Sequence, residues 1–412
     1  MTSFDTSPHL FETTPQLNVG RALLALAVVF VMLATTGWTA LREQRVTPAL
    51  EASVAAWEDG RIGGRDLPDA QAAPARLARF FASLTEGQRA QLARRYPLAV
   101  GNMNGVPVRL RYQANRLALG EARSEERKRM RDSRLTPAGQ QEAGWRMHRY
   151  ESLLRPGRNI LAFDPAGSGR VAEVFGNLDR AERVSVVVPG TDTDLLTFQR
   201  THRRYAAPVG MARSLYKAER ETSPDTRTAV IAWADYTAPR GLGMDAATAT
   251  LAAHGAVRLN GLVRALPGRA PVSLFCHSYG SVVCGLAARE LPTRVTDIAV
   301  AGSPGMRVEK ASQLRTSAHV WAMRDADDWI QDVPYLELGG LGHGADPVSA
   351  AFGARVLSAQ GAEGHSGYFV PGTRSLANFA EIGVGAYRAV DCARGDEGCR
   401  AGLSAAAAAG RA

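Results

Sequence analysis

The chain has 412 residues, of which 45% are hydrophobic, so it is long enough to bury a sizeable core. Its formal net charge of +9 comes almost wholly from arginine, and the arginines are interspersed with acidic residues, which argues against nucleic-acid binding. No pair among the four cysteines has zinc-ligand spacing, so we expect no metal. No cofactor is expected either.

The N-terminal 41 residues divide into a polar start and an apolar run. Residues 1–18 are polar and turn-rich and are expected to be disordered. Residues 22–41 carry no charge, and twenty such residues can cross a bilayer as a helix. We therefore assign residues 19–41 to a transmembrane anchor or a signal segment. The lack of a good small-x-small cleavage site favours an uncleaved anchor.

Residues 49–158 are rich in Ala, Arg and Glu and predict a helical N-terminal region. Thr85 and Gln88 have the spacing of a capping box, and Thr136 before Pro137 indicates another helix start. The charged runs in this region are typical of solvated helix faces.

From residue 159 to residue 390, strand and helix patterns alternate, beginning with a hairpin at 159–163 and 171–175. Further strands are predicted at 184–188, 228–234, 272–275, 295–301 and 318–323, with helices near 194–218, 246–266, 280–291 and 376–389. This alternation predicts an α/β fold with a doubly wound, mostly parallel sheet. Gly167 and Gly169 resemble part of a dinucleotide fingerprint, but a strand pattern follows them, so that interpretation is rejected.

The stretch 271–290 reads as a strand, a sharp turn and a helix. Its sequence CHSYG at 276–280 matches the G-x-S-x-G nucleophile elbow, with cysteine in place of the first glycine. Such a turn lifts the Ser278 hydroxyl clear of the sheet, with helix amides directed at the group it attacks. A serine that merely caps the helix is the plainer alternative. Cys276 and Cys284 are expected to be buried thiols.

An elbow serine needs a histidine base and a carboxylate, in the chain order Ser, acid, His. Asp328 follows the strand at 318–323 and is the candidate acid, with Asp327 as the alternate; either aspartate could instead only cap a turn. His365 and His343 are the candidate bases. His365 is preferred because residues 350–357 can form a further core element before it.

A serine hydrolase binds the oxyanion of its intermediate with two backbone amides, one of which follows the nucleophile. The second is expected from the loop after the strand at 184–188. We assign this role to the backbone amides of Thr191 and Tyr279, and Gly190 would allow close approach of the backbone. His277, inside the elbow, is expected to support its neighbours rather than to act on the substrate.

Residues 391–412 end in an alanine-rich, low-complexity run and are expected to form a flexible tail. Within them Cys392 and Cys399 flank a short polar loop and could close a disulfide. That pair hints at an oxidising compartment. The catalytic domain is therefore expected outside the cytoplasm, anchored to the membrane, or secreted if residues 19–41 are cleaved.

Several short segments occur together in a characteristic order: VGNMNGVP, ANR, FDPAGSGRVAEVFGNLDRA, VVVPGT, HSYGS, AGSPG, GHGADP and GHSGYF. In this combination the chain resembles the actinobacterial alpha/beta-hydrolase family long catalogued as a domain of unknown function. The resemblance covers residues 76–388 and implies a serine-type hydrolase with a helical N-terminal addition, but no substrate. Cys276 and the apolar N-terminal segment depart from the family pattern.

Three functions are compatible with these features. A serine hydrolase would cleave a lipid or cell-envelope ester through an acyl-enzyme, since a membrane tether concentrates such substrates. An acyltransferase would use the same residues with an acceptor other than water. A membrane-anchored binding module would keep the fold without turnover. The expected partners are a small-molecule or lipid ester and the membrane through residues 22–41, and the oligomeric state is left open.

Overall fold

The structure is a computed structural model and describes residues 48–403. The polar start, the apolar segment at 22–41 and residues 404–412 lie outside the described residues. Within residues 48–403, every helix is too short or too polar to cross a bilayer.

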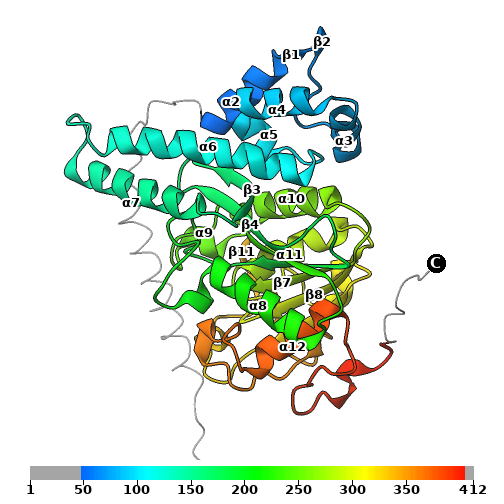
Figure 1. The fold of residues 1–412 in the computed structure, drawn as a ribbon. Helices are drawn as coiled ribbons and strands as arrows, with labels where there is room; N and C mark the ends of the chain where they lie inside the picture. The colour runs from blue at the N-terminus through cyan, green and yellow to red at the C-terminus, as the bar shows by residue number, and fades with distance from the viewer. Residues whose placement is uncertain (1–47, 404–412) are drawn as a thin grey trace, which may run out of the picture. The chain divides into compact units, whose positions relative to one another are not determined.

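A sheet forms the centre of the fold (Figure 1). It has eight strands in the order β12-β9-β8-β7-β5-β6-β4-β3. Neighbours from β12 to β6 are parallel, whereas β4 runs antiparallel to both β6 and β3. The expected mostly parallel sheet is thereby confirmed. The strands are β3 (Asn159–Asp164), β4 (Arg170–Gly176), β5 (Arg183–Val188), β6 (Thr228–Ala234), β7 (Val272–His277), β8 (Val295–Ala301), β9 (His319–Met323) and β12 (Arg355–Val356).

Helices cover both faces of this sheet, because alternate residues of each strand point to opposite sides. On β7, Leu274 packs with the buried side chains of α10 and α11, while Phe275 packs with those of α8 and α12. The central strands are therefore apolar on both faces, as parallel strands between two helical layers require. These helices are α8 (Pro208–Thr222), α9 (Met244–Ala247), α10 (Thr250–Ala265), α11 (Gly280–Ala287) and α12 (Arg374–Val384).

The residues before β3 form helices around a separate apolar cluster centred on Trp57, Phe81 and Tyr96. The predicted capping box is present at the start of α4, where Thr85 and Gln88 exchange hydrogen bonds, and Thr136 caps α7. The elements are α2 (Ala49–Glu58), β1 (Arg61–Ile62), β2 (Arg65–Asp66), α3 (Pro74–Ala82), α4 (Glu86–Arg95), α5 (Pro97–Asn102), α6 (Val108–Arg129) and α7 (Pro137–Leu153).

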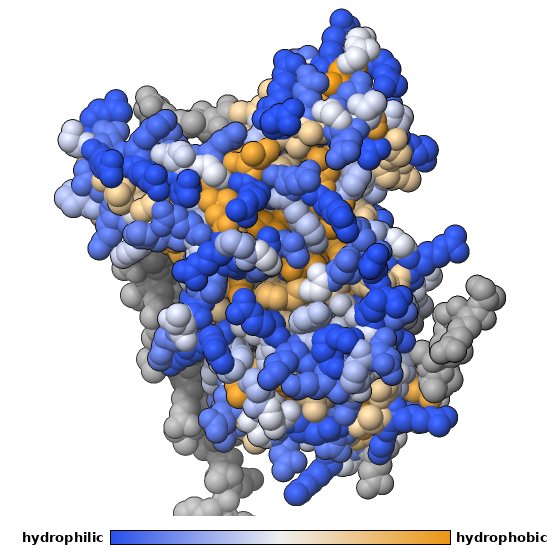
Figure 2. Space-filling view, in the orientation of Figure 1, coloured by the Kyte–Doolittle hydropathy of each residue, from blue (hydrophilic) through white to orange (hydrophobic). Residues whose placement is uncertain are grey.

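Two asparagines fasten this helical region to the edge strand β3. The Asn102 side chain donates to the Phe163 carbonyl at 2.7 Å and accepts from the Phe163 amide at 3.1 Å, as a neighbouring strand would. Asn115 donates to the Ile160 carbonyl at 3.0 Å. The helices thus cover an edge that would otherwise expose unpaired backbone groups. Figure 2 shows hydrophobic side chains gathered beneath α6 and around β3.

Among the predicted helices, one begins late and another is divided. The helix expected from residue 194 begins only at Pro208, because a proline inside a helix lacks the amide that the helix would need. Before it, Asp194 and Thr197 hydrogen-bond to each other's backbone and hold an irregular loop. The helix expected at 246–266 is divided into α9 and α10.

The segment 391–403, expected as part of a flexible tail, packs against the sheet edge. Ala393 donates to the Val356 carbonyl, and the Asp396 carboxylate accepts from the Val356 amide at 2.7 Å. The Cys392–Cys399 disulfide closes this segment, as its spacing suggested. Short 3-10 turns complete the fold at Arg204–Ala206, Ala288–Glu290, Ala311–Leu314, Trp329–Asp332, Gly364–Ser366 and Glu397–Arg400.

Candidate active site

The predicted elbow lies between β7, which ends at His277, and α11, which begins at Gly280. Ser278 sits in the turn with φ of 55°, a left-handed conformation that residues with a Cβ atom rarely adopt. Its amide donates to the Ala301 carbonyl of β8 at 3.0 Å. The strand on one side and the helix on the other therefore hold this serine in a strained turn.

Glycine is required at position 280 in this turn and at position 190 in the facing loop, because the end of β5 approaches the turn closely. A Cβ atom on Gly280 would lie 2.3 Å from the Val188 carbonyl oxygen, and one on Gly190 would lie 2.6 Å from the Ser278 Cβ. The loop after β5 is therefore pressed against the nucleophile candidate itself. The expected close approach at Gly190 is present.

Cys276 and Cys284 form a disulfide, so the expectation of two separate thiols is wrong. The bond joins the end of β7 to α11 across the elbow, with the two Cα atoms 6.5 Å apart and both residues buried. The two cysteines are eight positions apart in the sequence, one in the strand and the other in the helix, and the sharp turn brings them together. At position 276, where the elbow pattern usually has a small residue, this chain has one of the two disulfide-bonded cysteines.

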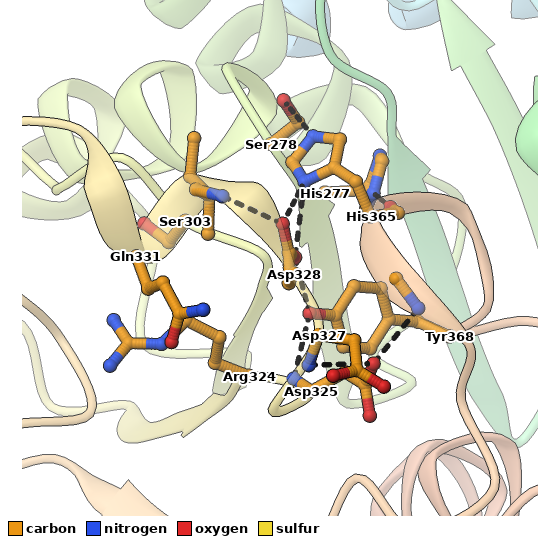
Figure 3. A network of polar contacts seen from close by, with 12 residues as sticks. His277, Ser278, Ser303, Arg324, Asp325, Asp327, Asp328, Gln331, His365 and Tyr368 are labelled. Atoms are coloured by element: carbon orange, nitrogen blue, oxygen red, sulfur yellow. Dashed lines mark hydrogen bonds and ion pairs between the residues drawn. The ribbon is translucent and has the colours of Figure 1, made fainter.

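A chain of hydrogen bonds links the three residues that the sequence singled out (Figure 3). The His365 Nε2 atom lies 2.8 Å from the Ser278 Oγ, and His365 Nδ1 lies 2.8 Å from Asp328 Oδ1. A carboxylate can only accept, so Nδ1 carries the proton and Nε2 is free to accept from the serine hydroxyl. These three residues come from three different loops at the carboxyl ends of β7, β9 and the last core strand, β12.

Asp328 is fully buried, and its carboxylate accepts hydrogen bonds from three residues. Besides His365, the Tyr368 hydroxyl donates to its Oδ2 at 2.5 Å and the Ile330 amide donates to its Oδ1 at 2.9 Å. Burial alone would raise the pKa of Asp328, but the hydrogen bonds from His365 and Tyr368 outweigh burial and hold this pKa below its usual range. Asp328 is therefore ionised when it contacts the imidazole.

The alternate acid, Asp327, is exposed and makes no hydrogen bond to His365 within the described residues. Its amide donates to the Asp325 carboxylate, which also accepts from the Gly364 amide at 2.8 Å. Asp325 thus ties the loop after β9 to the loop that carries His365. The sequence did not identify this role, or that of Tyr368 as a donor to Asp328, because both contacts join loops about forty residues apart.

Two aromatic side chains hold the imidazole of His365 in place. The His277 Nε2–H group donates to the His365 carbonyl at 2.6 Å, which fits the supporting role expected for His277. Burial, followed by the nearby His365 ring, lowers the pKa of His277 to about 3, so His277 is neutral. The Trp329 ring also packs against the imidazole, with its centroid 4.7 Å from that of His365.

His343, the alternate base, is not part of this chain of hydrogen bonds. Its Nε2–H group donates to the Ala246 carbonyl at 2.7 Å, and its ring packs edge-on against Tyr279. Burial lowers the pKa of His343, so the ring is a neutral packing group. It joins α9 to the loop after β9.

A cavity of about 460 Å³ opens beside Ser278. Thr191 and Tyr279, the candidate oxyanion donors, both line it, and neither backbone amide donates to another group in residues 48–403. The rest of the lining is almost entirely apolar and comprises Leu242, Ala246, Ala247, Pro304, Trp329, Ile330, Val333, Pro334, Leu336, Leu338, Leu341, Gly342 and His343. A larger open depression between α4, α6 and α7 is not lined by Ser278, Asp328 or His365.

Metal chemistry has no ligand set in the described part of the chain. No group of three or more His, Cys, Asp or Glu side chains within residues 48–403 is arranged to hold a metal ion. The polar groups next to the cavity are the Ser278 hydroxyl, the His365 imidazole bonded to it and the Asp328 carboxylate behind that imidazole.

Comparison with known proteins identifies the fold of this region. The family model described as an alpha/beta hydrolase matches residues 164–338. An uncharacterised Mycobacterium tuberculosis protein, Rv0963c, is 31% identical over 204 residues, covering 47% of this chain and 75% of the relative. Another from the same organism, Rv2079, is 28% identical over 364 residues. That match covers 74% of this chain, which spans only 55% of the relative.

Among solved structures, the 2,6-dihydroxy-pseudo-oxynicotine hydrolase aligns with 67% of this chain and 78% of its own. The sequence identity is 10% and the TM-score is 0.27. That score is too low to support an argument about function.

Proposed function

The chain belongs to the alpha/beta-hydrolase family, and we propose that it is a serine hydrolase that cleaves an ester of lipid or cell-envelope type. Ser278 would act as the nucleophile, His365 as the general base and Asp328 as the carboxylate that orients the base. The observation that carries the proposal is the geometry of His365, which has one ring nitrogen 2.8 Å from a hydroxyl and the other 2.8 Å from a buried carboxylate.

The proposed reaction begins when the Ser278 oxygen attacks the ester carbonyl carbon and passes its proton to His365 Nε2. Asp328 stabilises the imidazolium that forms. When the tetrahedral intermediate collapses, the same proton moves to the departing alkoxide and leaves an acyl group on Ser278. Water then attacks the acyl carbon while His365 Nε2 accepts its proton, and when this second tetrahedral intermediate collapses that proton passes to the Ser278 oxygen and the free acid leaves.

The amides of Thr191 and Tyr279 are proposed to bind the negative oxygen of both tetrahedral intermediates. Support comes from their place in the lining of the Ser278 cavity and from the absence of any other acceptor for them in residues 48–403. Amides that face an oxyanion before it forms would need no rearrangement as charge develops, and removal of one such donor costs on the order of 100- to 1,000-fold in rate.

The apolar lining of the cavity supports a substrate with a hydrocarbon portion next to the scissile bond. We also propose that residues 22–41 anchor the protein to a membrane and that the catalytic domain lies outside the cytoplasm. The two disulfides in the described residues support an oxidising compartment, because buried and loop disulfides alike persist poorly in reducing cytosol.

The test is covalent labelling with a fluorophosphonate probe, which reacts with activated serines. Wild-type protein should carry one adduct, located on Ser278 by peptide mass spectrometry, and Ser278→Ala should carry none. Ser281→Ala, which removes a buried hydroxyl three residues further on, is the matched control and should label normally. A folded wild-type protein that fails to label would instead indicate a binding module without turnover.

A further inference from the structure

Large apolar side chains are concentrated on the surface around the mouth of the Ser278 cavity. Nine such side chains are exposed in the described residues, and five of them line this cavity. We call these five the apolar rim: Leu242, Trp329, Leu336, Leu338 and Leu341. Single exposed leucines are normal on protein surfaces, whereas a contiguous group marks an interaction site.

The side chains of the apolar rim lie on segments that hydrogen bonds and an ion pair hold in place. Its members come from the loop before α9, the turn at Trp329–Asp332 and the hairpin of β10 (Glu337–Leu338) and β11 (Leu341–Gly342). Arg307 holds the hairpin from beneath, since it pairs with the Glu337 carboxylate at 2.6 Å and donates to the Gly342 carbonyl at 2.5 Å. The hairpin is therefore fixed with Leu338 still 76% exposed.

The electrostatics of the apolar rim favour an apolar partner over a charged one. Arg307 and Glu337, the charged pair at its base, neutralise each other. The five side chains above them carry no charge. A nucleic acid or an acidic protein would find no unpaired cation on the rim itself to bind.

Two observations indicate what covers this surface. The rim continues into the cavity that contains Ser278, so its occupant is positioned to deliver substrate to that serine. The chain also carries the uncharged run at 22–41, and the seven residues 42–48 that separate it from α2 reach at most about 25 Å. An anchored chain would therefore hold its folded part close to a bilayer.

We propose that the apolar rim docks onto the surface of a lipid assembly, from which the acyl chain of an ester passes into the Ser278 cavity. The proposal rests on the proposed function for the fate of the ester, but the docking itself requires no turnover. It makes lipids presented at a surface, rather than esters dissolved in water, the substrate class of this site.

The test places a reporter at single positions of the full chain reconstituted into phosphatidylcholine–phosphatidylglycerol vesicles. All four native cysteines are in disulfides, so an introduced cysteine supplies one reactive thiol for an environment-sensitive fluorophore. Leu338→Cys and Leu242→Cys sample two separate segments of the rim. Val257→Cys is the control, because Val257 on α10 is as exposed as Leu242, at 72%, and does not line the cavity.

Spin-labelled lipids should quench the fluorophore at residues 338 and 242 several-fold more than at residue 257. Equal quenching at all three positions, or quenching at only one of the two rim positions, would overturn the proposal. Protection of the rim fluorophores that appears without lipid and grows with protein concentration would also overturn it, and would indicate contact between two copies of the chain.

Repeating the measurement in a Ser278→Ala background separates this proposal from the proposed function. Quenching that persists in the variant, together with absent fluorophosphonate labelling of the wild type, would refute the hydrolase mechanism and leave docking intact. Normal labelling of Ser278 without selective quenching at the rim would refute docking alone.

Discussion

Ser278 combines a side chain with a backbone conformation that normally favours glycine. A left-handed φ at such a residue costs on the order of 1–3 kcal/mol and persists only where surrounding contacts hold it. Here the Ala301 carbonyl accepts from its amide, and the Cys276–Cys284 disulfide joins the two elements that flank it. The strained turn directs the Ser278 hydroxyl towards His365. The strain lowers the stability of the fold at the residue whose position the proposed chemistry requires.

We predict that His365→Ala lowers turnover of an ester by a factor on the order of a thousand or more, as Ser278→Ala does, because the two groups act as a unit. The double variant should therefore lose little further activity. Steady-state kinetics of the three proteins on one chromogenic ester provide the measurement.

His343→Ala is the matched control for that prediction. It removes a buried neutral ring that contacts Ala246 and Tyr279 but not Ser278. We expect a lower melting temperature or a higher KM with kcat largely retained. If His343→Ala abolishes turnover while His365→Ala retains it, the proposed assignment of the base is wrong.

At the level of elements, α8 buries a carboxyl group between the sheet and α12. Glu219 of α8 accepts from the Ser185 hydroxyl of β5 and is fully buried. A Cβ atom on Gly383 of α12 would lie 2.3 Å from its Oε1, so the glycine makes room for this carboxyl. Burial raises the pKa of Glu219 to about 8, against the opposing effect of the Ser185 hydrogen bond. The folded protein therefore favours the protonated acid.

The raised pKa makes stability depend on pH with a definite sign. Below the unfolded pKa, near 4.5, Glu219 is protonated in both states and costs nothing. As pH rises towards about 8, the unfolded state releases its proton while the folded state keeps it, so the free energy of unfolding falls. Each unit of pKa difference corresponds to about 1.4 kcal/mol, so the total is on the order of a few kcal/mol.

We predict that Glu219→Gln removes this part of the pH dependence. Urea unfolding at pH 5 and pH 8.5 should show the variant gaining stability relative to wild type as pH rises, by up to a few kcal/mol at pH 8.5. Glu221→Gln, at an exposed position on the same helix, should leave the pH dependence unchanged. A wild-type difference between the two pH values that Glu219→Gln leaves intact would mean that this carboxyl ionises freely in the fold.

Across the whole molecule, the helical residues before β3 are structurally part of the hydrolase unit. Residues 48–403 group as one compact unit. Asn102 and Asn115 bind β3, and residues of α6 and α7 share a core with the sheet. Removal of these helices would expose the edge of the sheet.

Deletion of residues 1–44 should, in contrast, release a soluble protein that retains its activity. The deleted residues include the whole uncharged run, whose composition suits a bilayer rather than a water-exposed surface. Solubility after centrifugation and the rate of fluorophosphonate labelling, compared with full-length protein in detergent, provide the measurement. Insolubility of the shortened chain in every buffer tried would indicate that the run packs against the folded unit.

Features that depend on neighbouring residues were predictable from the sequence. The apolar runs at 228–234 and 295–301 became β6 and β8 with the expected bounds, and the capping box of α4 and the turn around Ser278 were recognised from residue types at fixed spacing. Each is determined by side-chain periodicity or by backbone sterics within a few residues. The sheet class follows from their alternation along the chain.

Only the tertiary structure decided which distant groups meet. Asp327 and Asp328 are adjacent in sequence, yet one is exposed and the other is buried against His365, because the loop after β9 turns between them. The Cys276–Cys284 bond, the convergence of the apolar rim and the hydrogen bond from Tyr368 to Asp328 likewise join segments whose approach is set by the packing of the whole sheet. No local pattern encodes these contacts, because their geometry exists only once the strands are in register.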